Sequence, residues 1–152
     1  AHQYEHSLEV QIPFLQEVQN NLSIVPLALS HLTFGICEKL ASALAQAIVD
    51  YEHPVLLLAS SDMSHYESRS SASRKDAMAL ERLISLDAAG LYTVVAENRI
   101  SMCGVIPVVT VLLASLQLGA DHAEVVRYTD SGDVSRDTDK VVGYAGAVIS
   151  KA

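Results

Sequence analysis

The chain has 152 residues, of which 50% are hydrophobic and 18% are charged, and its formal net charge at pH 7 is −8. This composition is typical of one globular domain with a sizeable core and excludes an intrinsically disordered chain. The negative charge and the lack of any basic run argue against a nucleic-acid partner, because such partners usually meet a basic protein face.

The first part of the chain alternates helical and strand patterns. Residues 7–20 read as a helix that breaks or kinks at Pro13, because proline removes a helix hydrogen bond. The short, β-branched apolar run at 22–30 predicts a buried strand, and apolar positions at helical spacing predict a helix over 33–51. The continuous apolar run at 53–61 is the strongest strand pattern, of the kind found in parallel sheets covered on both faces.

After a polar loop, the second part of the chain predicts three helices and then two strands around a turn-rich stretch. The helices are expected at about 72–85, 87–97 and 105–118, and the strands at about 123–131 and 140–150. Strands that alternate with helices indicate a single α/β domain over 1–152, with a layered parallel or mixed sheet flanked by helices. We expect its central strand to include Leu56–Ala59, with the helix of 105–118 buried against it.

The stretch "SSDMSH" (60–65) follows the strongest strand pattern, where α/β sheets usually carry their sites. Asp62 and His65 could orient each other there, or could share a metal ion or a substrate proton. The alternative is a turn in which Asp62 caps the backbone and His65 is solvated. A hydrolase with Ser60 or Ser61 as nucleophile is disfavoured, because no G-x-S-x-G motif is present.

Cys103 precedes a glycine at the predicted start of the helix of 105–118. Unpaired N–H groups and the positive end of the helix dipole favour a thiolate there, and a thiolate is a good ligand for iron, copper or zinc. The alternative is a small side chain that only fills space, which is our interpretation of Cys37 inside its amphipathic helix. Two such cysteines make no disulfide framework, so we expect reduced thiols in a cytoplasmic protein.

His6 lies at the start of the first predicted helix, between an acidic residue and a serine. From these neighbours alone it is either an ordinary helix-start residue or a metal ligand whose partners lie far along the chain. The remaining histidines that flank predicted strands, His31, His53 and His122, are most simply surface residues.

Four segments in this order resemble the Memo-like family, whose prokaryotic members are called AmmeMemoRadiSam system protein B. They are "EHSLEVQIPF", "SSDMSH", "CGVIPVVTVLL" and "GYAGAVI", and the resemblance covers essentially the whole chain. It implies a fold related to LigB-type class III extradiol dioxygenases, and a metal site of two histidines and one cysteine. Carried over to this chain, it implies His6 and Cys103 as metal ligands, with Asp62 and His65 as acid/base or ligand-orienting groups.

The chain departs from the family in one respect. Family members have a further N-terminal part with a "PHAGY"-like segment that carries another ligand histidine, and this segment is absent here. We therefore expect the chain, which also lacks an initiator Met, to be the C-terminal portion of the fold with two of the three ligands. Such a portion should expose sheet edge or apolar surface and self-associate.

The resemblance implies a non-haem metal site with redox or dioxygenase-type chemistry. Two imidazoles and one anionic ligand leave positions on Fe(II) open for dioxygen or substrate, and a thiolate makes copper the second choice of metal. The alternative is a non-catalytic binding module that uses the same cleft for a peptide or small ligand. Radical-SAM and Ammecr-type proteins are partners implied by the family, and no membrane partner is expected because the longest apolar stretch is too short to span a bilayer.

Overall fold

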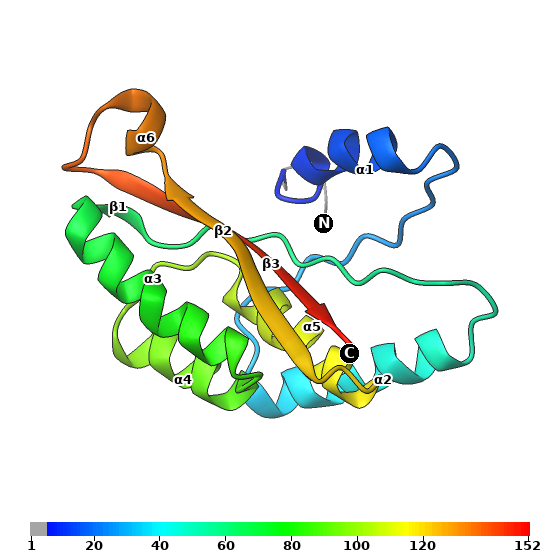
Figure 1. Ribbon diagram of the computed structural model, residues 1–152. Coiled ribbons are helices and arrows are strands. Elements are labelled where there is room, and N and C mark those ends of the chain that lie inside the picture. Colours follow the sequence, from blue (N-terminus) through cyan, green and yellow to red (C-terminus); the bar gives the residue numbers. More distant parts are fainter. Residues whose placement is uncertain (1–5) are drawn as a thin grey trace.

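The computed structural model describes residues 6–152 and shows a mixed α/β architecture (Figure 1). The helices are the 3₁₀ turn η1 (Glu9–Gln11), α1 (Ile12–Val18), α2 (Phe34–Val49), α3 (Arg69–Ile84), α4 (Ala88–Glu97), α5 (Val105–Gln117) and α6 (Gly132–Ser135). The strands are β1 (His65–Glu67), β2 (His122–Asp130) and β3 (Val141–Ser150). The predicted helices at 33–51, 72–85, 87–97 and 105–118 and the two C-terminal strands are thus confirmed, with shifts of a few residues at their ends.

The three strands form one small sheet in the order β1-β3-β2. Both pairings are antiparallel, with His65 opposite Val142 and Thr129 opposite Tyr144. The short connection through α6 explains this direction for β2 and β3, because only antiparallel strands can be joined by so short a turn. The parallel or mixed sheet expected from the sequence is therefore not confirmed among residues 6–152.

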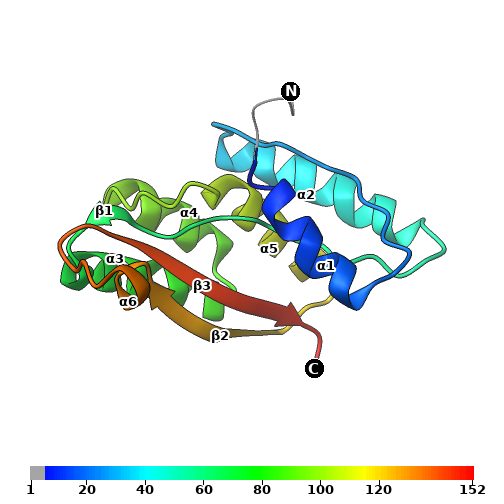
Figure 2. The same ribbon diagram turned by 90° about the horizontal axis from the view of Figure 1, so that it is seen from above.

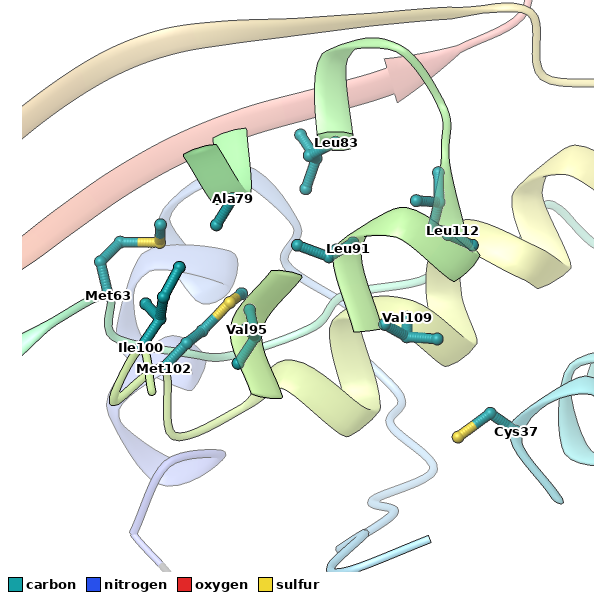
Figure 3. Packing of buried hydrophobic residues seen from close by; sticks show 11 residues of the cluster. Cys37, Met63, Ala79, Leu83, Leu91, Val95, Ile100, Met102, Val109 and Leu112 are labelled. Atoms are coloured by element: carbon teal, nitrogen blue, oxygen red, sulfur yellow. The ribbon is translucent and has the colours of Figure 1, made fainter. Parts of the chain in front are cut away.

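The core lies between the helices and the β2–β3 hairpin. Helix α5 packs against α2, α4 and β3, while α3 packs against α4 and both long strands (Figure 2). Leu91 of α4 meets Val109 and Leu112 of α5 in this core, and all three are almost fully buried (Figure 3). The helix expected at 105–118 is confirmed as part of the core, although it packs against α2, α4 and β3 and the central strand expected beside it is not formed. The core position of Cys37, which is fully buried, is confirmed.

Two segments that the sequence predicts as strands, 22–30 and 53–61, are not strands in the structure. They run without a strand ladder, and Val25 and Leu56 are 86% and 76% exposed. A strand needs a hydrogen-bonding neighbour as well as an apolar sequence, and none of the described strands pairs with these segments. We call 22–30 and 53–61 the unpaired segments; the central strand expected at Leu56–Ala59 falls within the second.

Pro13 begins a helix instead of breaking one. It occupies the first turn of α1, directly after the 3₁₀ turn. The first turn of a helix has no intrahelical acceptor for its N–H groups, so a proline costs nothing there. The helical stretch predicted over 7–20 is thus divided into η1 and α1 next to Pro13, and the proline lies in the first turn of α1 and not at a break inside one helix.

Among residues 6–152, no helix combines the length and the apolarity that crossing a bilayer requires. The cytoplasmic location inferred from the cysteines stays a prediction. The two cysteines are both free thiols.

Ion pairs anchor the start of α3 to the tip of the hairpin. The Arg69 guanidinium donates to Asp130 at 2.6 Å and to Asp133 at 2.8 Å, and Asp130 is buried. The hydrogen bond from Arg69 lowers the pKa of Asp130, and the hydrogen bond from Lys75 lowers that of Glu67. A carboxyl whose pKa is lowered by folding stabilises the fold above its unfolded pKa of about 4, and this stabilisation is lost as the pH falls through the lowered value.

We therefore predict that Arg69→Gln lowers the melting temperature at pH 7, and that the difference from the wild type shrinks as the pH falls from about 4 through the lowered pKa of Asp130, because the carboxyl is then protonated in the folded wild type as well. Thermal melts followed by circular dichroism between pH 7 and pH 2 measure this. The control is Arg127→Gln, at an exposed arginine of β2, which should leave the melting curve nearly unchanged. A difference between wild type and Arg69→Gln that stays constant across the pH range would contradict the prediction.

Candidate metal centre

Three side chains from two distant parts of the sequence meet beside the start of α5. One ligand atom each from Asp62, His65 and Cys103 lies within 4.8 Å of the others. Asp62 directly follows the second unpaired segment, His65 is the first residue of β1, and Cys103 lies just before the N-terminus of α5. Three of the four residues that the sequence singled out as candidate site residues thus lie together, and His6 is not in this group.

Strand pairing fixes the backbone that carries Asp62 and His65. The N–H of Met63 donates to the carbonyl of Gly143 at 2.9 Å, and the N–H of Gly143 donates to the carbonyl of Ser64 at 2.8 Å. Asp62 and His65 stand on either side of this pair of bonds. Their backbone positions are therefore set by β3, although the segment looked like a free polar loop in the sequence.

The imidazole of His65 is held in one tautomer. Its Nδ1 lies 2.8 Å from the carbonyl oxygen of Ser101, and its backbone N–H donates to the Ser101 hydroxyl at 2.7 Å. A carbonyl oxygen can only accept, so Nδ1 carries the hydrogen and Nε2 is left with its lone pair in the neutral ring. This is the arrangement by which proteins orient a histidine that binds metal through Nε2.

The free side of the His65 ring faces the Asp62 carboxylate, with Nε2 3.4 Å from Oδ2. Two lone pairs at this distance repel each other unless a proton or a metal cation is shared between them. The imidazole is about one-fifth exposed and the carboxylate about half exposed. The pair can therefore exchange a proton or an ion with solvent.

Cys103 is held close to the Asp62 backbone. Its Sγ accepts the N–H of Asp62 at 3.2 Å and lies 3.9 Å from the Ser61 hydroxyl. Gly104, the N-cap of α5, lets the two chain segments approach, since a Cβ there would lie 2.5 Å from the Ser60 carbonyl oxygen. The Gly104 N–H also donates to Ser61 Oγ at 2.9 Å. The "CG" pair is thus explained as a thiol next to a position where no larger residue fits.

A cleft of about 170 Å³ borders Cys103. Its walls come from the N-terminal turn, from both unpaired segments and from α5, and include Ser7, Leu27, Leu58 and Pro107. This places the two unpaired segments side by side at the cleft. The cleft lies within reach of solvent and borders the sulfur, so a small molecule could approach the thiol from this side.

His6 is not part of the three-residue group. Its Nδ1 lies 3.0 Å from Oε2 of Glu9, and its ring is exposed. The next residue, Ser7, lines the cleft that Cys103 also lines. His6 as a metal ligand stays a prediction, while His31, His53 and His122 are exposed as expected.

The serines of the motif have structural partners. Ser60 Oγ accepts the side-chain amide of Gln11 at 3.0 Å, and Ser61 Oγ donates to the carbonyl of Asp62 at 2.7 Å. The His65 ring faces Ser101 and Asp62, so it is not placed as a base for either hydroxyl. The structure therefore gives no support to a serine hydrolase. Ser101, which orients His65, was missed in the sequence because nothing local marks a contact across 36 residues.

The chain matches the family model described as "Memo-like protein" over residues 1–148. It is 37% identical over 141 residues to a MEMO1 family protein of Pyrobaculum aerophilum, which covers 93% of this chain and 50% of that protein. It is 41% identical to a MEMO1 family protein of Sulfolobus acidocaldarius (95% of this chain, 51% of the relative) and 40% identical to one of Thermotoga maritima (98% and 52%). The chain thus spans about half the length of the curated relatives it matches.

Proposed function

The chain belongs to the Memo-like family, and on this premise we propose that it binds one redox-active metal ion, iron first and copper second, at Asp62, His65 and Cys103. The observation that carries this proposal is the meeting of a carboxylate oxygen, an imidazole nitrogen and a cysteine sulfur within 4.8 Å. An oxygen, a nitrogen and a sulfur donor suit a first-row transition metal better than magnesium or calcium, which prefer oxygen ligands only.

The residues present fit such an ion. The imidazole is already oriented by Ser101, and the Asp62 N–H already donates to Cys103 Sγ. Three protein ligands leave coordination positions free, so a bound iron or copper ion would supply a place for dioxygen or substrate and a change of redox state. His6, whose neighbour Ser7 lines the cleft, would be a further ligand. Asp62 or His65 could alternatively hold or move a proton beside the ion.

We propose, further, that in the complete fold the unpaired segments become strands of a layered sheet of the kind found in LigB-type dioxygenases. Their exposed apolar residues and their length support this, because such sequences are usually buried between helices. The described chain would then be the C-terminal portion of that fold, and the additional length of the relatives would supply the neighbouring strands and another ligand histidine. Radical-SAM and Ammecr-type proteins remain partners proposed from the family resemblance alone.

The second candidate is a non-catalytic binding module. The cleft beside Cys103 supports it, because Leu27, Leu58 and Pro107 give it an apolar lining. Its volume of about 170 Å³ is smaller than the ~300 Å³ at which pockets begin to hold drug-sized molecules, so it suits a small ligand better than a peptide.

The experiment that separates the two candidates is metal analysis combined with oxygen uptake. The chain is incubated anaerobically with Fe(II), or in air with Cu(II), then desalted and analysed for bound metal. We expect close to one ion per chain, and oxygen consumption by the iron-loaded protein in the presence of a reductant above that of free iron. Stoichiometric metal without oxygen uptake favours the binding module, and no retained metal contradicts the proposed metal site.

A further inference from the structure

Asp76 is a buried carboxylate that the proposed metal site does not use. It lies on the inner face of α3 and has no exposed surface. A carboxylate removed from water is costly unless its oxygens accept hydrogen bonds. Two of its donors are the backbone N–H of Ser64 at 2.9 Å and the hydroxyl of Tyr128 at 2.7 Å. Asp76 thus joins α3 to β2 and to the segment that carries the metal-site residues.

Gly143 of β3 makes this contact geometrically feasible. A Cβ at this position would lie 2.2 Å from Asp76 Oδ2 and 3.1 Å from Met63 Cβ. The carboxylate therefore occupies the space that a side chain on β3 would fill. Gly143, the first glycine of "GYAGAVI", is needed here because any side chain would collide with the Asp76 carboxylate. A larger residue would push Asp76 away from Ser64.

Tyr128 completes the arrangement from the opposite strand. Burial raises the pKa of its phenol, and the hydrogen bond to Asp76 raises it further. The phenol is therefore neutral near pH 7 and donates its hydrogen to Asp76. A backbone amide and a neutral phenol are thus among the donors to Asp76, and these directed hydrogen bonds fix where the two partners lie.

Ser64, whose backbone N–H donates to Asp76, lies between Asp62 and His65 in the chain. Ser64 is two residues from Asp62 and one from His65. The Ser64 amide is bonded to Asp76, whereas its own hydroxyl is buried and has no partner among residues 6–152. The backbone path at this point is therefore set by the amide and the carboxylate, and the Ser64 side chain contributes no hydrogen bond to it.

We propose that Asp76 and Tyr128 are positioning residues for the metal site: Tyr128 donates to Asp76, Asp76 accepts the N–H of Ser64, and these two bonds hold the 62–65 segment so that Asp62 and His65 face Cys103. This rests on the proposed function, since what is positioned is the proposed ligand set. The two residues touch neither the ion nor a substrate. They act through the Ser64 amide: its hydrogen bond to Asp76 fixes the backbone from which the Asp62 and His65 side chains project.

The test compares Tyr128→Phe, Asp76→Asn and Asp76→Ala with the wild type in the 152-residue chain. Two readouts are used: the Co(II) dissociation constant with its thiolate-to-metal absorption band, and the ¹⁵N chemical shifts of the His65 ring in the metal-free protein. Tyr128→Phe should weaken Co(II) binding about tenfold and shift the His65 ring signals. Asp76→Asn, which can still accept the Ser64 N–H, should bind Co(II) more tightly than Asp76→Ala. Ser64→Ala is the matched control and should change neither readout, because it removes a hydroxyl that has no partner.

If the variants lose only thermal stability, with the Co(II) affinity, the absorption band and the ring shifts all as in the wild type, the positioning role is refuted. Failure of the proposed function gives a different result. In that case the wild type binds no Co(II) through a thiolate, yet the ring shifts of the metal-free Tyr128→Phe protein still report whether the segment has moved. Unchanged ring shifts in that protein would overturn the inference by themselves.

Discussion

Replacing Cys103 by alanine is expected to lower the affinity for Fe(II) and Cu(II) by at least about a hundredfold. Loss of groups that merely orient a metal ligand costs about 10- to 100-fold in affinity, so loss of a ligand should reach the upper end or exceed it. The sulfur is one of only three donors that the described residues bring together. The side chain is exposed, so its removal leaves no cavity in the core, and the melting temperature should change little.

Cys37→Ala is the matched control for this variant. It removes the other thiol, which is buried in the core, so it should lower stability without changing metal affinity. Competition titrations against a chromophoric chelator measure both proteins under the same conditions. Equal metal affinity of Cys103→Ala and the wild type would exclude the sulfur as a ligand.

The 152-residue chain studied on its own is expected to self-associate through the unpaired segments. Val25 and Leu56 are 86% and 76% exposed, and extended apolar segments without ladder partners tend to pair with another chain. We therefore expect dimers or larger species at tens of micromolar. Introducing a charge with Val25→Asp or Leu56→Asp should weaken association at least tenfold, because a carboxylate placed against an apolar surface costs more than about 1.4 kcal/mol.

Sedimentation velocity at several concentrations measures this association. Val134→Asp is the matched control, because Val134 is an equally exposed valine (89%) on α6, at the far end of the molecule from the unpaired segments (Figure 1). It should associate like the wild type. A wild-type chain that stays monomeric at high concentration would show that the unpaired segments are not an association surface.

Short sequence patterns predicted the helices and the C-terminal hairpin, because these elements form between residues that are close together in the chain. Helical spacing located α2 and α5, and the hairpin of β2 and β3 followed from two β-rich runs around a turn. The unpaired segments show the opposite case, because an apolar run predicts a strand only if a neighbour supplies its hydrogen bonds. The short strand β1 was missed for the same reason, as its three residues pair with β3 about 75 positions later.

The candidate site was predictable in part. The motifs pointed to Asp62, His65 and Cys103, and the fold brings these three together. Ser101 and Asp76 were not predictable, because a serine that accepts from a distant amide and a buried aspartate inside a helix have no sequence pattern of their own. Such supporting contacts appear only once the chain is folded, since they depend on which backbone groups the strand pairing leaves to be satisfied.

The most direct test of the metal-site proposal is X-ray absorption spectroscopy at the iron edge of the iron-loaded, 152-residue chain. The account predicts one sulfur neighbour at about 2.3 Å, a length typical of metal–thiolate bonds, together with nitrogen or oxygen neighbours at about 2.0–2.2 Å. The sulfur contribution should disappear in Cys103→Ala and persist in Cys37→Ala. A wild-type spectrum fitted by nitrogen and oxygen neighbours alone would contradict the proposal that Cys103 binds the ion.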